Sequence, residues 1–369
     1  MTPVEERLRE GILRGGPILF DEVVDLALYH PAHGFYAAGG QAGRRGDFLT
    51  SPEVGPLFGL VVARALDAWW DEAGQPPTFV VVEAGAGPGT LARSVLAAEP
   101  RCGAALRYVL VERAAAQRVQ HADGLPLEDP TAAFAGLVEP GGDDSTSLLA
   151  PGGPIVVSRA DLPRLSGPCI VLANELLDNL PFGLLEHTAA GWSEVHVGIE
   201  GDELVEVLLP TAAEGPDLPI GARIPRQTVA AEWVRDALAL AGPDGRVVAI
   251  DYASTTADLA GRPMHEWLRT YRQHVRGAPP LEGLGTQDIT CEVTVDQLPP
   301  PSSNRSQAEW LRAHGIDDLV AEGRRIWHER AGFGDLAAVR ARSRITEAEA
   351  LCDPTGLGAF RVLEWPQDL

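Results

Sequence analysis

The segment Phe79 to Leu91, FVVVEAGAGPGTL, places an apolar run, an acid and three glycines in direct succession. Its first residues suit a buried parallel strand, and Thr90 to Ala97 can form the helix that follows. Gly85, Gly87 and Gly89 allow positive φ and a close approach of the backbone to a ligand. This order predicts an α/β fold with a nucleotide-type site, and the alternative is a glycine-rich turn that binds nothing.

The spacing of the glycines narrows the choice of ligand. In the G-x-G-x-x-G dinucleotide fingerprint, the third glycine follows the second by three residues and an acid comes about 20 residues later. Here the glycines are two residues apart and Glu83 precedes Gly85 by two residues. That arrangement is typical of the loop that binds S-adenosylmethionine in Rossmann-like methyltransferases. We therefore predict Glu83, Gly85, Gly87 and Gly89 as binding residues and S-adenosylmethionine as the cofactor, with an NAD-linked oxidoreductase disfavoured.

Two further acids are candidates for the same ligand. Glu112 ends the next predicted strand, which covers residues 107–112, and lies 29 residues after Glu83. An acid at a strand end can accept hydrogen bonds from both ribose hydroxyls of an adenosyl group, although acids at strand ends are also commonly structural. Asp161 follows the predicted strand at 155–158 and can similarly approach the adenine amine.

The segment Val171 to Pro181, VLANELLDNLP, places Asn174, Glu175 and Asp178 just beyond another buried strand. Ligands of open α/β sheets bind at such carboxyl ends. Two carboxylates and an amide there can hold a cationic group, because a guanidinium matches a carboxylate fork. The residues alone fit a helix N-terminus equally well, with Asn174 as its cap.

Composition excludes several classes of protein. The net charge of −22 argues against binding to nucleic acid and favours a basic partner or simple solubility. The chain has no lysine, so a Schiff-base or Walker mechanism is excluded. Its four cysteines form no CxxC pair, and we expect neither a disulfide framework nor a metal site. Without an apolar span or signal-type start, we expect a cytoplasmic protein that does not bind membranes.

Along the chain, residues 1–76 suggest a helical and loop cap, with a helix at 56–73 after a glycine-rich segment. We assign residues 77–298 to a Rossmann-like core with insertions near 123–154 and 184–244, the second containing a β-hairpin at 192–197 and 203–209. Strands are expected at 168–173, 246–251 and 289–295, and a helix at 263–275. Residues 299–369 should add one helix, capped by Ser302 or Ser303, and a final strand at 359–365. Together these elements predict one mixed sheet with insertions.

Five motifs in a fixed order resemble the MidA-like methyltransferases, a family that includes the mitochondrial complex I assembly factor. They are GDFLTSPEVGPLFG (46–59), VEAGAGPGTL (82–91), ANELLDNLP (173–181), IDYA (250–253) and GTQDITCEV (285–293). The resemblance also covers LYHPAHGFY near the start, SQAEWLRAHGI (306–316) and GAFRVLEW near the end, so it spans nearly the whole chain. The chain departs from the usual family pattern at Asn179, Ala253 and Thr294.

The resemblance implies a class I S-adenosylmethionine fold and methyl transfer to an arginine side chain of a protein. Carried over residue by residue, it implies that Asp47, Asn174, Glu175 and Asp178 face the reacting centre. His274 is a further possible base, although a single helical histidine more often serves packing. Two alternatives stay open: a methyltransferase that acts on a small molecule, and an assembly or chaperone-like module that binds the cofactor without turnover.

Overall fold

The computed structural model describes residues 1–37, 39, 50–129, 152–165, 167–213, 215–272, 275–333 and 335–366. Three expectations therefore lie outside the described residues: Asp47, His274 and most of the insertion predicted near 123–154. Within the described part, no helix is long and apolar enough to cross a membrane.

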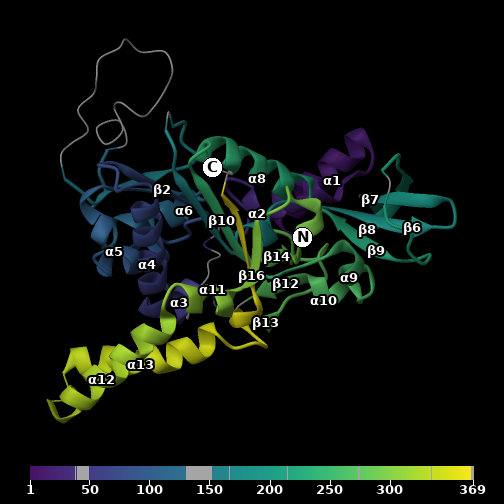
Figure 1. The fold of residues 1–369 in the computed structure, drawn as a ribbon. Helices are drawn as coiled ribbons and strands as arrows, with labels where there is room; N and C mark the ends of the chain where they lie inside the picture. The colour runs from purple at the N-terminus through teal and green to yellow at the C-terminus, as the bar shows by residue number, and fades with distance from the viewer. Residues whose placement is uncertain are drawn as a thin grey trace.

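A seven-stranded sheet forms the centre of the molecule, and its strands run in the order β16-β17-β10-β5-β2-β3-β4 (Figure 1). The bounds are β2 Phe79–Ala84, β3 Leu106–Val111, β4 Ile155–Arg159, β5 Ile170–Asn174, β10 Arg246–Asp251, β16 Ser303–Ser306 and β17 Arg361–Pro366. The five strands from β4 to β10 are parallel, and β17 is antiparallel to both of its neighbours. This is the α/β sheet that the apolar runs predicted.

Successive side chains of the central strands point to opposite faces and enter two separate cores. In β2, Val81 joins the core beneath α4, α5 and the C-terminal helices, whereas Val80 and Val82 join the core beneath α8. Every residue of β2 and β3 is buried, as expected for parallel strands covered on both faces. The covering helices are α4 Pro56–Glu72, α5 Thr90–Ala97, α8 Thr228–Ala241 and α11 Gln307–Ala313, with the short α3 Ser51–Val54 and α6 Ala115–Arg118 at their edges.

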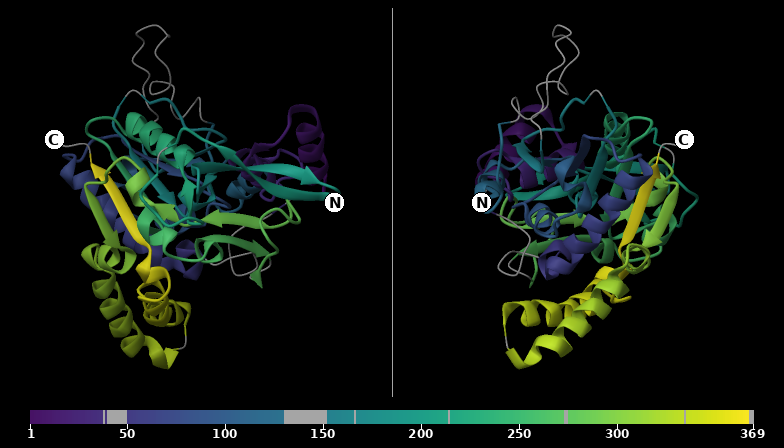
Figure 2. Two further views of the ribbon diagram at one scale, coloured as in Figure 1. Left: turned by 90° about the vertical axis from the view of Figure 1, so that its right-hand side faces the viewer. Right: turned by 60° about the vertical axis from the view of Figure 1, so that its left-hand side comes forward.

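A second, five-stranded sheet lies to one side of the central one (Figures 1 and 2). It consists of β1 Ile18–Leu19, β6 Gly183–Thr188, β7 Gly191–Glu200, β8 Glu203–Pro210 and β9 Arg223–Arg226. The β7–β8 pair confirms the predicted hairpin. The N-terminal helices, α1 Pro3–Gly15 and α2 Phe20–Tyr29, share a third core with this sheet, so the insertion and the N-terminal cap fold together.

The predicted helix at 263–275 is wrong. Among the described residues of this range, only α10 Met264–Trp267 is helical, and β12 Leu268–Arg272 follows it directly. Leu268 and Thr270 are buried while Arg269 and Tyr271 are only partly buried, because β12 pairs antiparallel with β14 Asp288–Cys291. Tertiary pairing decides the conformation of this segment. The small elements around it are β11 Ala253–Ser254, α9 Thr256–Ala260, β13 Val275–Arg276 and β15 Val293–Thr294.

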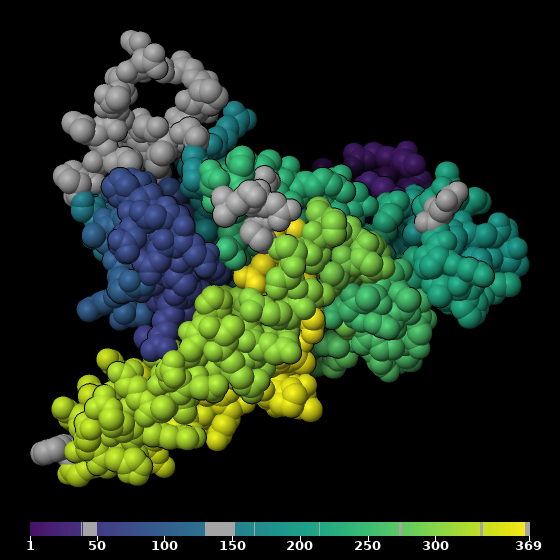
Figure 3. Space-filling view, viewed as in Figure 1, coloured from purple at the N-terminus to yellow at the C-terminus, as the bar shows by residue number. Residues whose placement is uncertain are grey.

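The C-terminal region differs from the expectation of one helix and a strand. Ser306, rather than Ser302 or Ser303, caps α11, because it forms a capping box with Glu309. The residues before it form β16. Two further helices, α12 Ile316–Arg330 and α13 Leu336–Leu351, form a hairpin that extends away from the rest of the molecule (Figure 3).

Candidate cofactor and acceptor site

The predicted site residues gather where the strand order of the central sheet reverses. From β2 the chain continues to β3 and β4 on one side, and then crosses to β5 and β10 on the other. Side chains and loops after β2 and β5 therefore diverge, which leaves a crevice at the carboxyl ends of the strands. The glycine loop follows β2, Glu112 follows β3, and Glu175 follows β5.

The glycine loop adopts the backbone that its sequence predicted. Gly85, Gly87 and Gly89 have φ values of 67°, 53° and 83°. At Gly85 a Cβ would also lie 2.9 Å from Cδ1 of Leu176, so both the dihedral and the space require glycine. Gly89 precedes α5 directly, and the loop therefore leads into the N-terminus of that helix.

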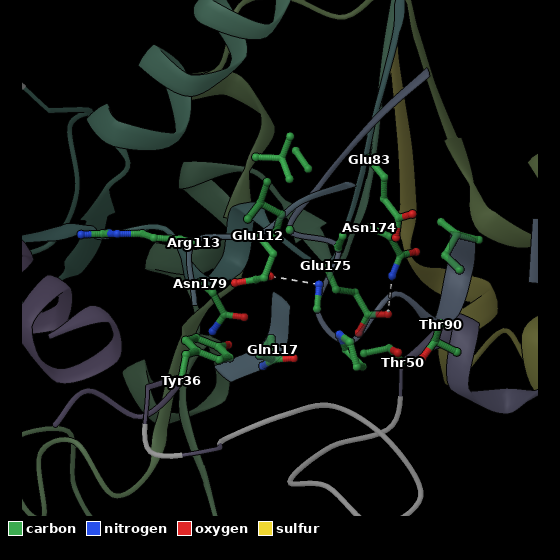
Figure 4. A pocket seen from close by; sticks show the side chains of 18 of the residues that line it. Tyr36, Thr50, Glu83, Thr90, Glu112, Arg113, Gln117, Asn174, Glu175 and Asn179 are labelled. Atoms are coloured by element: carbon green, nitrogen blue, oxygen red, sulfur yellow. Dashed lines mark hydrogen bonds between the residues drawn. The ribbon is translucent and has the colours of Figure 1, made fainter. Parts of the chain in front are cut away.

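A cavity of about 310 Å³ opens beside this loop (Figure 4). That volume lies within the usual range for ligand sites, roughly 300–1,000 Å³. Of the predicted site residues, the cavity is lined by Glu83, Gly85, Gly87, Glu112, Asp161, Asn174 and Glu175. The crevice thus collects acids and loop residues that are far apart in the sequence.

Glu112 lies at the point where the loop and the next strand meet. Its carboxylate accepts hydrogen bonds from the backbone N–H of Gly87, at 3.0 Å, and of Ala114, at 2.7 Å. Burial raises the pKa of Glu112, and the two hydrogen bonds and Arg118 act against that rise. A carboxylate has about four lone-pair sites, so two donors leave capacity for ligand hydroxyls.

Glu83 lines the cavity, but its carboxylate is also occupied within the protein. The hydroxyl of Tyr108 in β3 donates to it at 2.7 Å. Burial raises the pKa of Glu83 to about 7, although the Tyr108 hydrogen bond lowers it. Glu83 therefore supports the junction of β2 and β3 beneath the loop, and its contact with cofactor stays a prediction.

Asn174 and Glu175 project into the cavity from the end of β5 (Figure 4). Glu175 has φ = 51°, a left-handed conformation that is rare for a non-glycine residue, and its N–H donates to the carbonyl oxygen of Ile250 at 2.7 Å. One carboxyl oxygen, Oε1, accepts from the Asn174 side chain at 3.2 Å and from the backbone N–H of Ser51 at 3.1 Å. Burial raises the pKa of Glu175 to about 8.

Asp178 does not line the cavity. It is buried near Asp251 and Tyr252, and burial raises its pKa while a hydrogen bond from the Tyr252 hydroxyl lowers it. Asp251 accepts hydrogen bonds from the backbone N–H groups of Leu177 and Asp178. The structure therefore brings Asn174 and Glu175 to the cavity and leaves Asp178 in the layer of polar groups that supports them.

Two stacked tyrosines form another wall, which the sequence did not single out as a site. The rings of Tyr29 and Tyr36 lie 5.5 Å apart between centroids, and both line the cavity. The Tyr29 hydroxyl donates to the carbonyl oxygen of Asn179 at 3.1 Å, and the Tyr36 hydroxyl to Asp288 at 3.3 Å. Both tyrosines belong to the LYHPAHGFY motif, and Tyr36 also lies in the glycine-rich segment before the helix predicted at 56–73, whose mixture of residues is typical of ligand-binding loops.

The lining residues fit an adenosylated, positively charged ligand. The side-chain oxygen of Asn174 is buried in the cavity wall without a hydrogen-bond partner among the described residues, so it can accept from a ligand amine. Glu83, Glu112, Asp161 and Glu175 surround the space with carboxyl groups. Within the described part of the chain, no group of three or more His, Cys, Asp or Glu side chains could hold a metal ion.

This combination of a switch-point crevice, a two-residue glycine repeat and an acid after the second strand defines a class I methyltransferase fold. A family model described as "Putative S-adenosyl-L-methionine-dependent methyltransferase" matches residues 61–313. The chain belongs to this family, which confirms the MidA-like resemblance, and it is an S-adenosylmethionine-dependent methyltransferase.

Similar proteins agree with this assignment. "Protein arginine methyltransferase NDUFAF7, mitochondrial" from Rattus norvegicus is 29% identical over 86% of this chain and 75% of its own length. Its counterpart from Bos taurus is 28% identical over 86% of this chain and 74% of its own length. A crystal structure of a "likely methyl transferase" from Burkholderia thailandensis, bound to S-adenosyl-homocysteine, is 26% identical, covers 98% of this chain and 91% of that one, and gives a TM-score of 0.77.

Proposed function

We propose that this enzyme transfers the methyl group of S-adenosylmethionine to a side-chain nitrogen of an arginine in a partner protein. The observation that carries the proposal is the Glu175 carboxyl group, held at φ = 51° in the wall of the cavity beyond the glycine loop. A carboxylate fork binds a planar guanidinium with good geometry. The names of the relatives, which are protein arginine methyltransferases, point to the same acceptor.

The tyrosine wall supports a cationic acceptor as well. Tyr29 and Tyr36 present aromatic rings to the cavity, and aromatic faces attract guanidinium groups. Arg113 already lies 4.5 Å from the centroid of the Tyr29 ring and lines the cavity there, so a substrate guanidinium would face the Tyr36 ring. A substrate arginine could therefore lie between aromatic and carboxyl groups.

We assign the two ends of the cavity different roles. The glycine loop, Glu112 and Asp161 would hold the adenosyl part of the cofactor, and Asn174 with Glu175 would face the acceptor. When bound, S-adenosylmethionine supplies a methyl group on a positively charged sulfur atom, which becomes neutral as the methyl group leaves. Positioning of the acceptor nitrogen in line with the carbon–sulfur bond should provide much of the acceleration.

Glu175 would also accept the proton that the acceptor nitrogen loses. A guanidinium has a pKa above about 12, so its nitrogen must give up a proton during transfer. Because the pKa of Glu175 is raised to about 8, its ionised form is a stronger base than an ordinary glutamate. A neighbouring guanidinium favours that ionised form, so substrate binding would itself prepare the base.

The test compares Glu175→Gln with the wild type in two measurements. Gln keeps an oxygen that can accept from Ser51 and Asn174, but it cannot take a proton. We expect the affinity for S-adenosyl-homocysteine, measured by titration calorimetry, to stay within about twofold, and transfer to fall by about 10²-fold or more. Glu186→Gln, on β6 in the insertion sheet, is the matched control.

The acceptor is identified with labelled S-adenosylmethionine and a host lysate. A labelled protein band, with label recovered in methylarginine, supports the proposal. Label in a small-molecule product would replace it with the small-acceptor alternative, and absence of transfer would favour a binding module. Loss of cofactor binding in Glu175→Gln would contradict the division of the cavity into two ends. The cytoplasmic location stays a prediction.

A further inference from the structure

Ser51 connects Glu175 to the C-terminal region of the chain. Its backbone N–H donates to Oε1 of Glu175 at 3.1 Å, and its hydroxyl donates to Oε1 of Gln307 at 2.8 Å. Ser51 and Gln307 are both fully buried, with an exposed fraction of 0%. A polar path of two hydrogen bonds therefore runs from the cavity wall to the start of α11.

Gln307 is itself held on the far side. Its side-chain Nε2 donates to the carbonyl oxygen of Leu351, the last residue of α13, at 3.0 Å. Its backbone N–H donates to the carbonyl oxygen of Phe360 at 2.6 Å. These bonds fix the side chain between three C-terminal segments, so its Oε1 offers Ser51 one defined position.

The short helix α3 begins with Ser51, and the turn that joins it to α4 is anchored too. Glu347 of α13 accepts from the backbone N–H of Leu57 at 2.8 Å. A Cβ on Gly55 would lie 2.3 Å from the Glu347 carboxyl carbon, so the two segments are in close contact. Glu53 accepts from the Thr90 hydroxyl at 2.6 Å, which joins α3 to the helix after the glycine loop.

We infer that Gln307 is a positioning residue for methyl transfer: through Ser51, it holds an N–H donor against the Glu175 carboxyl group and so fixes its orientation. The inference rests on the proposed function, because it assigns Gln307 a role through Glu175. A left-handed backbone at a non-glycine residue persists only where its surroundings determine it. The Ser51 contact is one of the few polar contacts that the Glu175 side chain makes.

The Ser51 N–H is also the main polar group that counters burial at Glu175. Burial and the charge of Asp178 raise the pKa of Glu175, and the Ser51 and Asn174 hydrogen bonds lower it. Asp251 in β10 also interacts with Glu175, and Glu53 on α3 lines the same cavity. With acids on several sides, weakening the Ser51 donor should favour the protonated carboxyl group.

The experiment measures the titration of Glu175 in the full chain without any acceptor. Carboxyl ¹³C NMR gives the titration midpoint of Glu175 in the wild type, Gln307→Met and Ser51→Ala. The Glu175 signal is assigned as the one that is missing from the spectrum of Glu175→Gln. We expect both variants to raise the midpoint, by at most about one pH unit, because they release the backbone N–H of Ser51 from its position without removing this donor. Ser302→Ala is the control, because it removes a side-chain hydrogen bond to Glu364 in the same region.

Two further readouts separate positioning from general destabilisation. S-adenosyl-homocysteine affinity should stay within about twofold in both variants, because neither residue touches the glycine loop, and the acid limb of the pH–rate profile should move to higher pH with the midpoint. If Ser51→Ala folds and its Glu175 midpoint is unchanged, the inference is overturned. Because Ser51→Ala is a small substitution, it still provides the test if Gln307→Met fails to fold.

The results also distinguish this inference from the proposed function. If no label is recovered in methylarginine, the proposed function fails, whatever the midpoints show; if Glu175→Gln transfers methyl groups as fast as the wild type, the role of Glu175 as base fails. If Glu175→Gln is inactive while the midpoint and the pH–rate profile of both other variants match the wild type, only the role of Gln307 fails.

Discussion

The imidazole Nε2 of His121 lies 2.8 Å from the carbonyl oxygen of Gly87, the middle glycine of the loop. Its Nδ1 lies 2.8 Å from the hydroxyl oxygen of Ser158 in β4. Because a carbonyl can only accept, Nε2 carries the proton and Nδ1 accepts from Ser158. Burial lowers the pKa of His121, which favours the neutral ring. The ring therefore ties the glycine loop to a strand two positions away in the sheet.

We predict that His121→Leu weakens cofactor binding by about tenfold, or about 1.4 kcal/mol. Leucine fills much of the space but leaves the Gly87 carbonyl without its donor, so the loop loses its preferred position. Titration calorimetry with S-adenosyl-homocysteine measures the change. His328→Leu, which removes an exposed histidine on α12, is the control and should bind like the wild type. Equal affinities in all three proteins would show that the ring serves only packing.

A second prediction concerns Gly85. Gly85→Ala adds a Cβ 2.9 Å from Leu176 Cδ1 at a residue with φ = 67°, so it meets both dihedral strain and a steric clash. We expect a loss of stability of about 2 kcal/mol and weaker cofactor binding. Gly74→Ala is the matched control, because Gly74 has φ = 77° but no atom within 4 Å of the added Cβ. A thermal or urea unfolding series compares the two variants, and equal losses would mean that the clash is relieved without cost.

The central strands were predictable because their sequences are unambiguous. Phe79 to Val82 and the run at 108–111 are continuous apolar segments of strand length, which suit a buried parallel sheet. The glycine loop was predictable for a similar reason, since few backbones need three glycines at this spacing. Each of these signals lies within one short stretch of chain.

Other elements depend on contacts that no local pattern reveals. Leu268 to Arg272 resembles a helix continuation until β14 pairs with it. In α12, pairs such as Arg325–Glu329 cover the surface, and the apolar stripe is narrow. The pattern therefore gave little indication of a second and third C-terminal helix.

The candidate site likewise contains residues that a local pattern predicts and residues that only tertiary contacts bring there. Asn174 and Glu175 reach the cavity because they lie at the carboxyl end of β5, and strand ends are easily located. His121 and Ser51 act on the site through tertiary contacts, with the Gly87 carbonyl and the Glu175 carboxyl group. Ser51 belongs to the motif at 46–59, whereas His121 belongs to none of the motifs. Asp178, three residues after Glu175, turns away from the cavity because the chain forms a 3₁₀ turn at Leu177–Asn179. The spacing of these residues in the sequence does not predict that turn.

A third prediction follows from the raised pKa of Glu175, which burial moves from 4.5 to about 8. Between these values the folded protein keeps a proton that the unfolded chain releases, so this group lowers stability as pH rises from about 4.5 to 8. Glu175→Gln removes the titration. The variant should therefore gain stability relative to the wild type by a few kcal/mol at pH 8, and by little at pH 4.

Thermal unfolding at several pH values tests this dependence. The difference in melting temperature between Glu175→Gln and the wild type should widen with pH. Glu186→Gln serves again as the control, since its carboxylate is paired with Arg223 and Gln should not stabilise the protein. A difference that stays constant across the range would show that Glu175 ionises normally in the folded protein.

The last prediction separates the ribose end of the cavity from the acceptor end. Glu112 has lone pairs beyond those that accept hydrogen bonds from Gly87 and Ala114. A carboxylate that binds two ribose hydroxyls should contribute to the affinity for any ligand that contains adenosine. Glu112→Ala should therefore weaken S-adenosyl-homocysteine and adenosine by a similar factor, about tenfold or more. Calorimetry with both ligands measures the change, with Asp123→Asn, which alters an exposed acid further along the chain, as the control. If the affinity for S-adenosyl-homocysteine falls while adenosine binds as before, Glu112 acts on the amino-acid part of the ligand, and the orientation proposed for the cofactor must be reversed.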